Sequence, residues 1–241
     1  MFRHFLESLT DIVYPKKCLS CKNKLGATSI AGLICIDCWR KIKRNTPPFC
    51  HSCGRNLEKR SFTKSICPSC LRAKLHFDRA FAPCVYDGVI KNLIHEFKYR
   101  NKDYLGPHLS RLMIDFIKEY DLPIDYLDFI VPMPLHKARL REREFNQAQI
   151  LSKHICEEFK KDLLTDVLRR HRFTKTQTEL ETDKRFLNVK ESFSVIKERD
   201  LKGKNILLVD DVLTTGATAS EAARVLKNAG ANIVFVLTLA N

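Results

Sequence analysis

The sequence predicts an α/β protein in which a parallel sheet with flanking helices follows a small zinc-binding part. Three observations predict this class. Eight of the ten cysteines form four Cys-x-x-Cys pairs within residues 18–70. Strand-like and helix-like stretches alternate after residue 80, as in a mostly parallel sheet. One buried strand ends in two adjacent carboxylates, Asp210 and Asp211, before a hydroxyl-rich turn. We expect residues 1–80 and 81–241 to form the two parts.

Composition narrows the class of protein. The chain has 241 residues, of which 44% are hydrophobic, so wholesale disorder is excluded. The stretch 1–80 carries sixteen Lys or Arg against five Asp or Glu, whereas the rest carries twenty-six against twenty-three. This asymmetry favours a polyanionic partner, although it also serves solubility. The opening residues suggest a short helix and not a signal peptide, and no run reaches the roughly 18 apolar residues of a transmembrane helix. We expect a cytoplasmic protein.

The four Cys-x-x-Cys pairs form a repeat in which Cys18 corresponds to Cys50, so that "CLSCKNKL" matches "CHSCGRNL" and "LICIDC" matches "SICPSC". In a cytosolic chain such pairs are metal ligands rather than disulfides. Four thiolates complete a closed tetrahedral zinc site, which has a structural role. We expect about two zinc ions, most simply one per repeat, while an interleaved pairing stays open. The expected ligands are Cys18, Cys21, Cys35, Cys38, Cys50, Cys53, Cys67 and Cys70.

The elements after residue 80 are predicted from hydrophobic periodicity and from helix and strand terminators. In chain order they are a short strand over 81–88, a helix over 89–99, a helix starting near Pro107 and ending near residue 120, a strand over 127–131, a helix over 145–159, a strand over 166–173, a loop with a short helix over 174–190, a strand over 204–212, a helix over 218–231 and a closing strand over 232–240.

The stretch 206–218, "ILLVDDVLTTGAT", predicts a ligand site. Ligands of a parallel sheet bind at the carboxyl ends of its strands, where Asp210 and Asp211 lie. The helix start that follows offers free N–H groups and a positive dipole end to an anion, and Gly216 allows close backbone approach. Carboxylates suit a polyol and a divalent cation. A ribose with a 5′-phosphate suits both groups, because its hydroxyls match the carboxylates and its phosphate matches the helix start.

These residues resemble the phosphoribosyl pyrophosphate (PRPP) signature of type I phosphoribosyltransferases. The resemblance implies that Asp210 and Asp211, as the catalytic acids, hold the ribose hydroxyls of PRPP, which binds with Mg²⁺. It places the 5′-phosphate on the loop formed by Thr214, Thr215, Gly216, Ala217 and Thr218. The alternative is an ordinary strand–turn–helix in which an Asp or Thr caps the helix.

A second stretch, "VPMPLHKARLREREFNQA", follows the strand over 127–131. Cations after a rigid Pro-x-Pro turn suit a pyrophosphate, and Arg makes forked contacts with such groups. The stretch is similar to the pattern V-P-x-P…R-x-x-x-R-G-F-N-Q of the ComF family, the phosphoribosyltransferase-like proteins of bacterial competence. We expect pyrophosphate contacts at Pro132, Arg139 and Arg143; the alternative is a solvated basic helix start. Glu144 stands where the pattern has Gly.

The ComF resemblance covers nearly the whole chain, through "YDGVIKNLIHEFKYRNKDYLG", "TQTELETDKRFLNV" and the cysteine pairs. It implies that the 174–190 stretch is a mobile loop that closes over the substrate, with Lys175, Gln177 and Arg185 as candidate contacts. In the superfamily that the chain resembles, an element outside the sheet, called the hood, selects the acceptor. No C-terminal hood is expected here, so a hood would come from the zinc-binding part or from residues 81–105.

Three functions remain open at this stage. The chain is an active transferase on a base or amine, a PRPP-binding protein without catalysis that acts in DNA uptake, or a nucleic-acid adaptor on the same fold. "WRKIKR" places an aromatic ring beside the cations Arg40, Lys41, Lys43 and Arg44, which suits single-stranded DNA. The alternative is a solvated basic face. The resemblance adds natural transformation and a competence helicase as partner, and it leaves peripheral membrane association open.

Overall fold

The computed structural model describes residues 16–26, 28–57, 65–99, 102–172, 182–196 and 200–241. The helix expected before Cys18 and the first part of the 174–190 stretch lie outside these residues. The described elements are β1 (Ser29–Ile30), β2 (Ile34–Cys35), α2 (Ile36–Arg40), α3 (Pro68–Arg72), β3 (Arg79–Phe81), α4 (Gly88–Lys98), η2 (Asp103–Leu105), α5 (Gly106–Glu119), η3 (Ile124–Tyr126), β4 (Phe129–Pro132), α6 (Lys137–Arg143), α7 (Gln147–Phe159), β5 (Asp162–Leu163), β6 (Leu168–Arg170), α8 (Thr182–Val189), β7 (Phe193–Val195), β8 (Asn205–Val212), α9 (Ala217–Asn228) and β9 (Ile233–Ala240).

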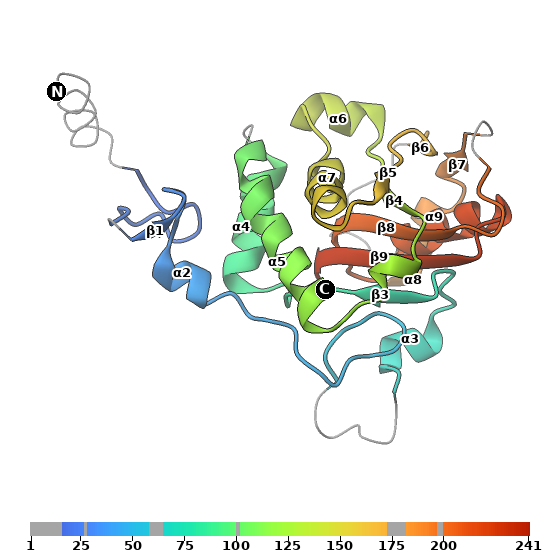
Figure 1. The fold of residues 1–241 in the computed structure, drawn as a ribbon, viewed down its shortest axis with the longest axis horizontal. Helices are drawn as coiled ribbons and strands as arrows, with labels where there is room; N and C mark the ends of the chain where they lie inside the picture. Colours follow the sequence, from blue (N-terminus) through green and yellow to red (C-terminus); the bar gives the residue numbers. More distant parts are fainter. Residues whose placement is uncertain (1–15, 27, 58–64, 100–101, 173–181, 197–199) are drawn as a thin grey trace.

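The main sheet is parallel. Within the described residues it has five strands in the order β3-β9-β8-β4-β5, and every neighbouring pair runs in the same direction. The long strands β8 and β9 form its centre (Figure 1). Both are almost wholly buried, which is why each is a near-continuous apolar run. The predicted class, a parallel α/β sheet after a cysteine-rich part, is confirmed.

Side chains of β8 alternate between two apolar layers. Leu207 and Val209 point into a core shared with α4, α5 and α7. Ile206 and Leu208 point into a second core on the opposite face, which is shared with α9. This two-residue period is the geometry of a strand covered on both faces. It leaves the carboxyl ends of β4, β8 and β9 at one edge of a three-layered structure.

Three elements differ from the sequence prediction. Strand β3 begins at Arg79, earlier than the predicted 81–88 strand, and the short helix α6 was not expected. The predicted 166–173 strand is only β6, and it pairs antiparallel with β7 in a separate two-stranded sheet. In β6 Leu168 is buried while Arg169 is exposed. A strand with one buried face suits an antiparallel ribbon better than the centre of a parallel sheet.

Candidate ligand site and zinc centres

Two four-cysteine clusters occur among the described residues, one formed by Cys18, Cys21, Cys35 and Cys38 and the other by Cys50, Cys53, Cys67 and Cys70. The sulfur atoms of each cluster lie within 4.8 Å of one another. The Cys21–Cys35 and Cys53–Cys67 sulfur distances are both 3.8 Å. A tetrahedral zinc with Zn–S bonds of about 2.3 Å separates its sulfurs by about 3.8 Å. The donor sets therefore fit structural zinc, one per repeat, and the interleaved pairing is wrong.

The two units share a local fold, which we name the first ribbon (residues 16–41) and the second ribbon (residues 48–73). A bridge joins Lys17 to Lys24 in the first, and the equivalent bridge joins Phe49 to Asn56 in the second. Helix α2 begins directly after Cys35, and α3 begins directly after the matching cysteine of the second unit. In each unit a backbone N–H donates to the first cysteine sulfur, at 3.4 Å and 3.3 Å. Repeated sequence has produced repeated structure.

The ribbons occupy different places in the molecule, the first beside α4 and the second next to the edge strand β3 (Figure 1). The first packs against α4, where Lys22 Nζ lies 2.6 Å from Glu96 Oε1. The second lies under β3, whose Ala80 N–H donates to Ser52 O over 2.8 Å. The second ribbon also reaches the turn after β8, because Arg55 Nη2 donates to Thr214 O at 3.3 Å. Among the described contacts, this is the ribbon that adjoins the predicted phosphate loop.

The acid pair lies at the carboxyl end of β8. The Asp211 N–H donates to Asp210 Oδ1 at 2.8 Å, and Lys98 Nζ forms a 2.9 Å ion pair with Asp211 Oδ2. Burial and the neighbouring Asp211 charge raise the pKa of Asp210 to about 7, although the Asp211 N–H, Lys98 and Arg170 oppose the shift. A shared proton or a bound cation relieves the repulsion between such neighbouring acids.

Arginines gather beside the acids. Burial lowers the pKa of Arg170, which lies within electrostatic range of Asp210, Arg139 and Arg143. Arg143 is buried at the end of α6, over the ring of Tyr99 at 5.6 Å, and its Nη1 donates to Gln147 Oε1 at 3.2 Å. Its Nε has no hydrogen-bond partner among the described residues. The fold thus brings the predicted pyrophosphate arginines to the acid edge.

Pro132 is the last residue of β4, paired in register with Val209 one residue before the acids. The strand ends there, and the Met133 N–H donates a hydrogen bond to Val209 O at 2.8 Å. Glu144 ends α6 in the left-handed region, with φ +66°. Gly is the residue that adopts this conformation without strain. An exposed Glu thus adopts, at the glycine position of the ComF pattern, a backbone conformation that glycine favours.

The predicted phosphate loop joins β8 to α9. Gly216 is the N-cap of α9 at φ +80°, a conformation that favours glycine. Ala217 is the first residue of α9 and is buried, whereas Thr215 and Thr218 are half-buried and Thr214 is exposed. The Ala217 N–H donates to Thr215 Oγ1 at 3.4 Å. The helix thus starts where the hydroxyls gather, one residue before the start of the predicted 218–231 helix.

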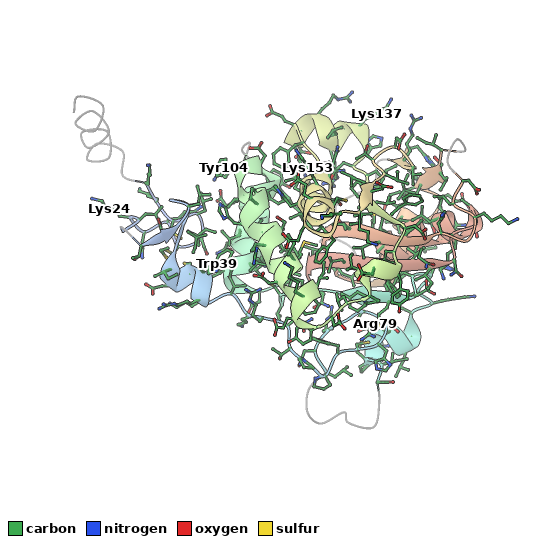
Figure 2. The ribbon with its side chains drawn as sticks, viewed as in Figure 1. Lys24, Trp39, Arg79, Tyr104, Lys137 and Lys153 are labelled. Carbon is green, nitrogen blue, oxygen red and sulfur yellow. The ribbon has the colours of Figure 1, made fainter. Side chains whose placement is uncertain are left out.

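The remaining predicted contacts are distributed elsewhere. Lys175 and Gln177 lie outside the described residues, and Arg185 belongs to α8, but its side chain is outside them. Arg40, Lys41, Lys43 and Arg44 are exposed. Lys43 forms an ion pair with Asp87. Trp39 is half-buried and packs against the first core, near α4 (Figure 2).

Sequence reasoning missed Lys98 and Arg170 as members of the acid site. Lys98 ends α4, inside the stretch "YDGVIKNLIHEFKYRNKDYLG" that carries the ComF resemblance, so a signal was present. Arg170 lies in a run of cations in "DVLRRHRF", which gave no indication of which cation would face the acids. No helix within the described ranges has the length and apolar character needed to cross a bilayer.

A parallel sheet with this strand–turn–helix, behind two four-cysteine centres, defines a phosphoribosyltransferase-like protein with a double zinc ribbon. Two family comparisons agree: residues 9–72 match the double zinc ribbon domain, and residues 146–241 match the phosphoribosyl transferase domain. The chain thus combines the two domains of ComF-type proteins, to which it is similar over most of its length.

Relatives match over nearly the full chain. Competence protein F of Haemophilus influenzae is 28% identical over 93% of this chain and 96% of its own length. DNA utilization protein YhgH of Salmonella typhi is 29% identical over 95% and 98%, and competence protein ComFC of Bacillus subtilis is 28% identical over 82% and 79%. Both halves of the architecture therefore occur together in these proteins.

Two solved structures are more distant. An adenine phosphoribosyltransferase from Leishmania donovani is 14% identical over 66% of this chain and 71% of its own, with a TM-score of 0.36. A glutamine PRPP amidotransferase from B. subtilis is 18% identical over 60% of this chain, with a TM-score of 0.35. This chain spans only 26% of the amidotransferase.

Proposed function

We propose that this protein binds PRPP at the carboxyl edge of its sheet and acts on incoming single-stranded DNA during natural transformation. The observation that carries the ligand assignment is the acid pair joined directly to a helix-start loop, with buried arginines beside it. Acids alone would repel a phosphate, and cations alone would not favour a polyol. The combination suits a sugar that carries phosphate at both ends.

Each residue has a role in this proposal. Asp210 and Asp211 hold the ribose hydroxyls, while the loop Thr214, Thr215, Gly216, Ala217 and Thr218 holds the 5′-phosphate. Pro132, Arg139 and Arg143 contact the pyrophosphate, and Arg170 adds charge there. Lys175, Gln177 and Arg185 belong to the covering loop. Residues 1–80 act as the zinc-ribbon domain and residues 81–241 as the ligand-binding domain.

The acid pair also fits Mg²⁺, because carboxylate oxygens are the donors that this cation prefers, usually alongside phosphate oxygens and water. When bound, Mg²⁺ would shield the charge of the pyrophosphate. Lys98 now neutralises Asp211 at 2.9 Å. A cation held by the same carboxylate would compete with Lys98 for its charge, and Lys98 would then add positive charge beside the pyrophosphate.

The role in DNA uptake is supported by two separate observations. The relatives are named for competence and for DNA utilization. In this chain Arg40, Lys41, Lys43 and Arg44 form an exposed basic segment between the two ribbons, and such charge favours phosphate backbones. The second candidate is an active transferase in nucleotide metabolism, in which a base or amine displaces pyrophosphate. Arginines beside the acid pair favour that chemistry as well.

Calorimetry with PRPP and Mg²⁺ tests the ligand assignment. We expect saturable binding by the wild type and at least a tenfold loss in Asp211→Asn, because a ribose and cation ligand is removed. Asp125→Asn, at an exposed site far from the acids, is the control. If the folded wild type binds neither PRPP nor ribose 5-phosphate at millimolar concentration, the assignment is wrong.

Single-strand binding needs a separate test. Neutralising Arg40, Lys41, Lys43 and Arg44 together should weaken oligonucleotide binding and reduce its salt dependence. A matched control neutralises four exposed cations elsewhere, Arg111, Lys153, Lys190 and Lys202. Equal losses in both quadruple variants would mean that only net charge matters. A deletion strain that recombines linear DNA at the parental frequency would disprove the biological role.

A further inference from the structure

The first four-cysteine cluster is open to solvent on one side. Cys21 is exposed and Cys35 is half-buried, whereas Cys18 and Cys38 are buried. The sulfurs of Cys21 and Cys35 lie 3.8 Å apart. We propose that Cys21 and Cys35 form a site of reversible oxidation, at which a peroxide converts the two thiolates to a disulfide and zinc leaves the first ribbon. This inference is independent of the proposed PRPP site.

The second cluster provides a comparison within the same molecule. Its equivalent residues, Cys53 and Cys67, also hold their sulfurs 3.8 Å apart. They are only 9% and 7% exposed, and Cys70 is the one half-buried member of that cluster. Because the sulfur separation is the same in both pairs, the two sites differ in how easily an oxidant reaches them. Oxidation of a thiolate depends on its exposure, so we expect the first cluster to react first.

The surroundings of Cys21 are also basic. Three exposed lysines lie within three or four residues of it along the chain, namely Lys17, Lys22 and Lys24. The equivalent positions of the second ribbon are uncharged, namely Phe49, Gly54 and Asn56. Lys22 is paired with Glu96, so Lys17 and Lys24, which are joined by a backbone bridge, supply the excess charge. Reactive cysteines typically occur in partly exposed, electropositive surroundings, and Cys21 meets both conditions.

The oxidation balances with hydrogen peroxide as the oxidant. The Cys21 thiolate attacks one peroxide oxygen and the O–O bond breaks, which leaves a sulfenic acid on Cys21 and releases hydroxide. The Cys35 thiolate then attacks the Cys21 sulfur, forms the S–S bond and displaces a second hydroxide. The two sulfurs together lose two electrons, and the peroxide gains both. A thiol reductant reverses the reaction by exchange through a mixed disulfide.

The disulfide removes two of the four zinc ligands. Only the thiolates of Cys18 and Cys38 would remain for the metal. Two thiolates do not complete the tetrahedral set of a structural zinc site. A metal that stabilises a small unit contributes its binding free energy to folding, so its departure destabilises that unit.

The effect of losing this zinc is confined to one part of the molecule. Cys35 is the N-cap of α2, whose last residue, Arg40, begins the exposed basic segment. Ile34, next to Cys35, packs into the core shared with α4. The second ribbon has its own four cysteines and packs into the second core. We therefore expect oxidation to loosen the first ribbon, α2 and the basic segment while the second ribbon and the sheet stay folded.

Peroxide treatment of the zinc-loaded full chain tests the proposal. Released zinc is measured with a chromogenic indicator, free thiols are alkylated at intervals, and disulfides are mapped by mass spectrometry. We expect about one zinc per chain to leave roughly tenfold faster than the other, together with a Cys21–Cys35 disulfide. A thiol reductant with added Zn²⁺ should restore the zinc content. Release of both ions at one rate, first oxidation at Cys70, or a sulfinic acid on Cys21 without a disulfide would overturn the proposal.

Matched histidine variants separate the role of Cys35 as disulfide partner from its role as zinc ligand. Cys35→His keeps four donors, because three cysteines and one histidine form a usual structural zinc set, but it removes the partner thiol. We expect peroxide to leave a sulfenic acid on Cys21 that a 1,3-diketone reagent traps. Cys67→His, at the equivalent position of the second ribbon, should form the Cys21–Cys35 disulfide as the wild type does.

Two outcomes of the variant experiment decide against the proposal. One is a zinc-loaded Cys35→His protein in which Cys21 stays reduced while another cysteine of the cluster is oxidised. The other is loss of the Cys21–Cys35 disulfide in Cys67→His. If Cys35→His fails to bind zinc in the first ribbon, the disulfide map of the wild type decides alone, and a disulfide that omits Cys21 or Cys35 would show the assignment to be wrong.

Discussion

The two zinc ribbons began as the same unit and now occupy unlike positions. They share their cysteine spacing, a hairpin bridge and a short helix. The first ribbon lies outside α4 and contacts it through buried apolar side chains, such as Ile34, and through polar groups, including Asn92 Nδ2 donating to Ser20 Oγ at 3.4 Å. The second lies next to the edge strand β3, packs into the second core and reaches the turn after β8. The repeated sequence therefore determines the local fold of each ribbon, but it does not determine where each ribbon lies in the molecule.

One position accounts for much of this difference. Lys22 and Gly54 occupy equivalent sites, and both adopt the left-handed conformation, at φ +64° and +69°. A Cβ on Gly54 would lie 2.3 Å from Ala80 O in β3, so only glycine allows the second ribbon to lie this close. In the first ribbon the same site carries a side chain that reaches Glu96. The second ribbon is thus joined by close backbone packing at this position, whereas the first forms an ion pair there and packs its apolar side chains, such as Ile34, into the core shared with α4.

The largest contrast is expected from removing each zinc site in turn. Cys50→Ser with Cys53→Ser should lower the unfolding free energy by about 4 kcal/mol or more and abolish ribose 5-phosphate binding, because that ribbon belongs to the second core. Cys18→Ser with Cys21→Ser should leave the affinity within about twofold. Elemental analysis, thermal unfolding and calorimetry measure the three quantities. Equal loss of affinity in both double variants would contradict the contrast.

Chelation of the wild type gives an independent measurement that needs no substitution. Cys21 is exposed, whereas only Cys70 of the second cluster is more than slightly accessible. We therefore expect the first zinc to leave first, without loss of ribose 5-phosphate binding, and the second to leave together with the affinity. Release of both ions in one step, or loss of affinity with the first ion, would argue against separate roles.

The matched glycine and lysine positions give the next largest effect. Gly54→Ala should destabilise the protein by about 2–3 kcal/mol, since it combines left-handed strain with overlap against Ala80. Lys22→Gly should change stability by less than about 1 kcal/mol, because the lost ion pair is offset by relief of the same strain. Urea unfolding of both variants measures this difference. A similar cost for the two would mean that the backbone contact with β3 is unimportant.

Local signals were enough to predict most of the second part of the chain. The elements of the parallel sheet arise from apolar residues that recur at a fixed period. The acid pair at a strand end and the helix-start loop arise from neighbouring residues in one short stretch. The left-handed conformation of Glu144, at φ +66°, was not predicted, although the residue stands where the ComF pattern has Gly. Zinc pairing within each repeat was the simpler of two alternatives, and it is confirmed by sulfur distances.

Contacts between distant segments were not predictable in the same way. Lys98 and Asp211 belong to elements far apart in the chain, α4 and β8, and nothing in either local pattern indicates the 2.9 Å ion pair between them. The position of the first ribbon depends on a contact with Glu96 and that of the second on a contact with Ala80. Both residues lie outside the repeat. The antiparallel pairing of β6 with β7 also joins segments separated by residues outside the described ranges. The roles of the acids, arginines and phosphate loop stay predictions.

A smaller effect is expected where the first ribbon meets α4. Burial favours the neutral form of Glu96, but hydrogen bonds from Lys102 and Lys22 outweigh it and lower its pKa to about 2. Glu96→Gln should cost about 1–2 kcal/mol at pH 7, a modest figure because Lys22 is 57% exposed. Because the pKa of Glu96 is lower in the folded than in the unfolded protein, its ionisation stabilises the fold at pH values above the unfolded pKa near 4.5. This stabilisation is lost as the pH falls towards 2.

The stability difference between wild type and Glu96→Gln should therefore shrink on acidification through that window. Urea unfolding at several pH values measures it. A difference that stays constant or grows in acid would mean that the ionised Glu96 does not stabilise the first ribbon. Ribose 5-phosphate affinity at neutral pH serves as the control and should remain unchanged, since Glu96 pairs with Lys22 and Lys102 and contacts neither acid.

The smallest and most specific contrast is between Arg55 and its repeat counterpart, Asn23. Arg55 Nη2 donates to Thr214 O at 3.3 Å, so it joins the second ribbon to the proposed phosphate loop, whereas Asn23 is exposed and contributes its backbone carbonyl within the first ribbon. Arg55→Ala should cost less than about 1 kcal/mol of stability, because the bond is long and exposed. It should weaken ribose 5-phosphate two- to fivefold, through loss of a nearby positive charge and of the contact that holds the loop. Asn23→Ala should change neither quantity.

Arg55→Gln keeps a hydrogen-bond donor and removes the charge. If ribose 5-phosphate affinity recovers in Arg55→Gln, the effect is due to the position of the loop. If the affinity stays low, the effect is due to the charge. Wild-type affinity in Arg55→Ala would show that the second ribbon lies beside the loop without influencing it.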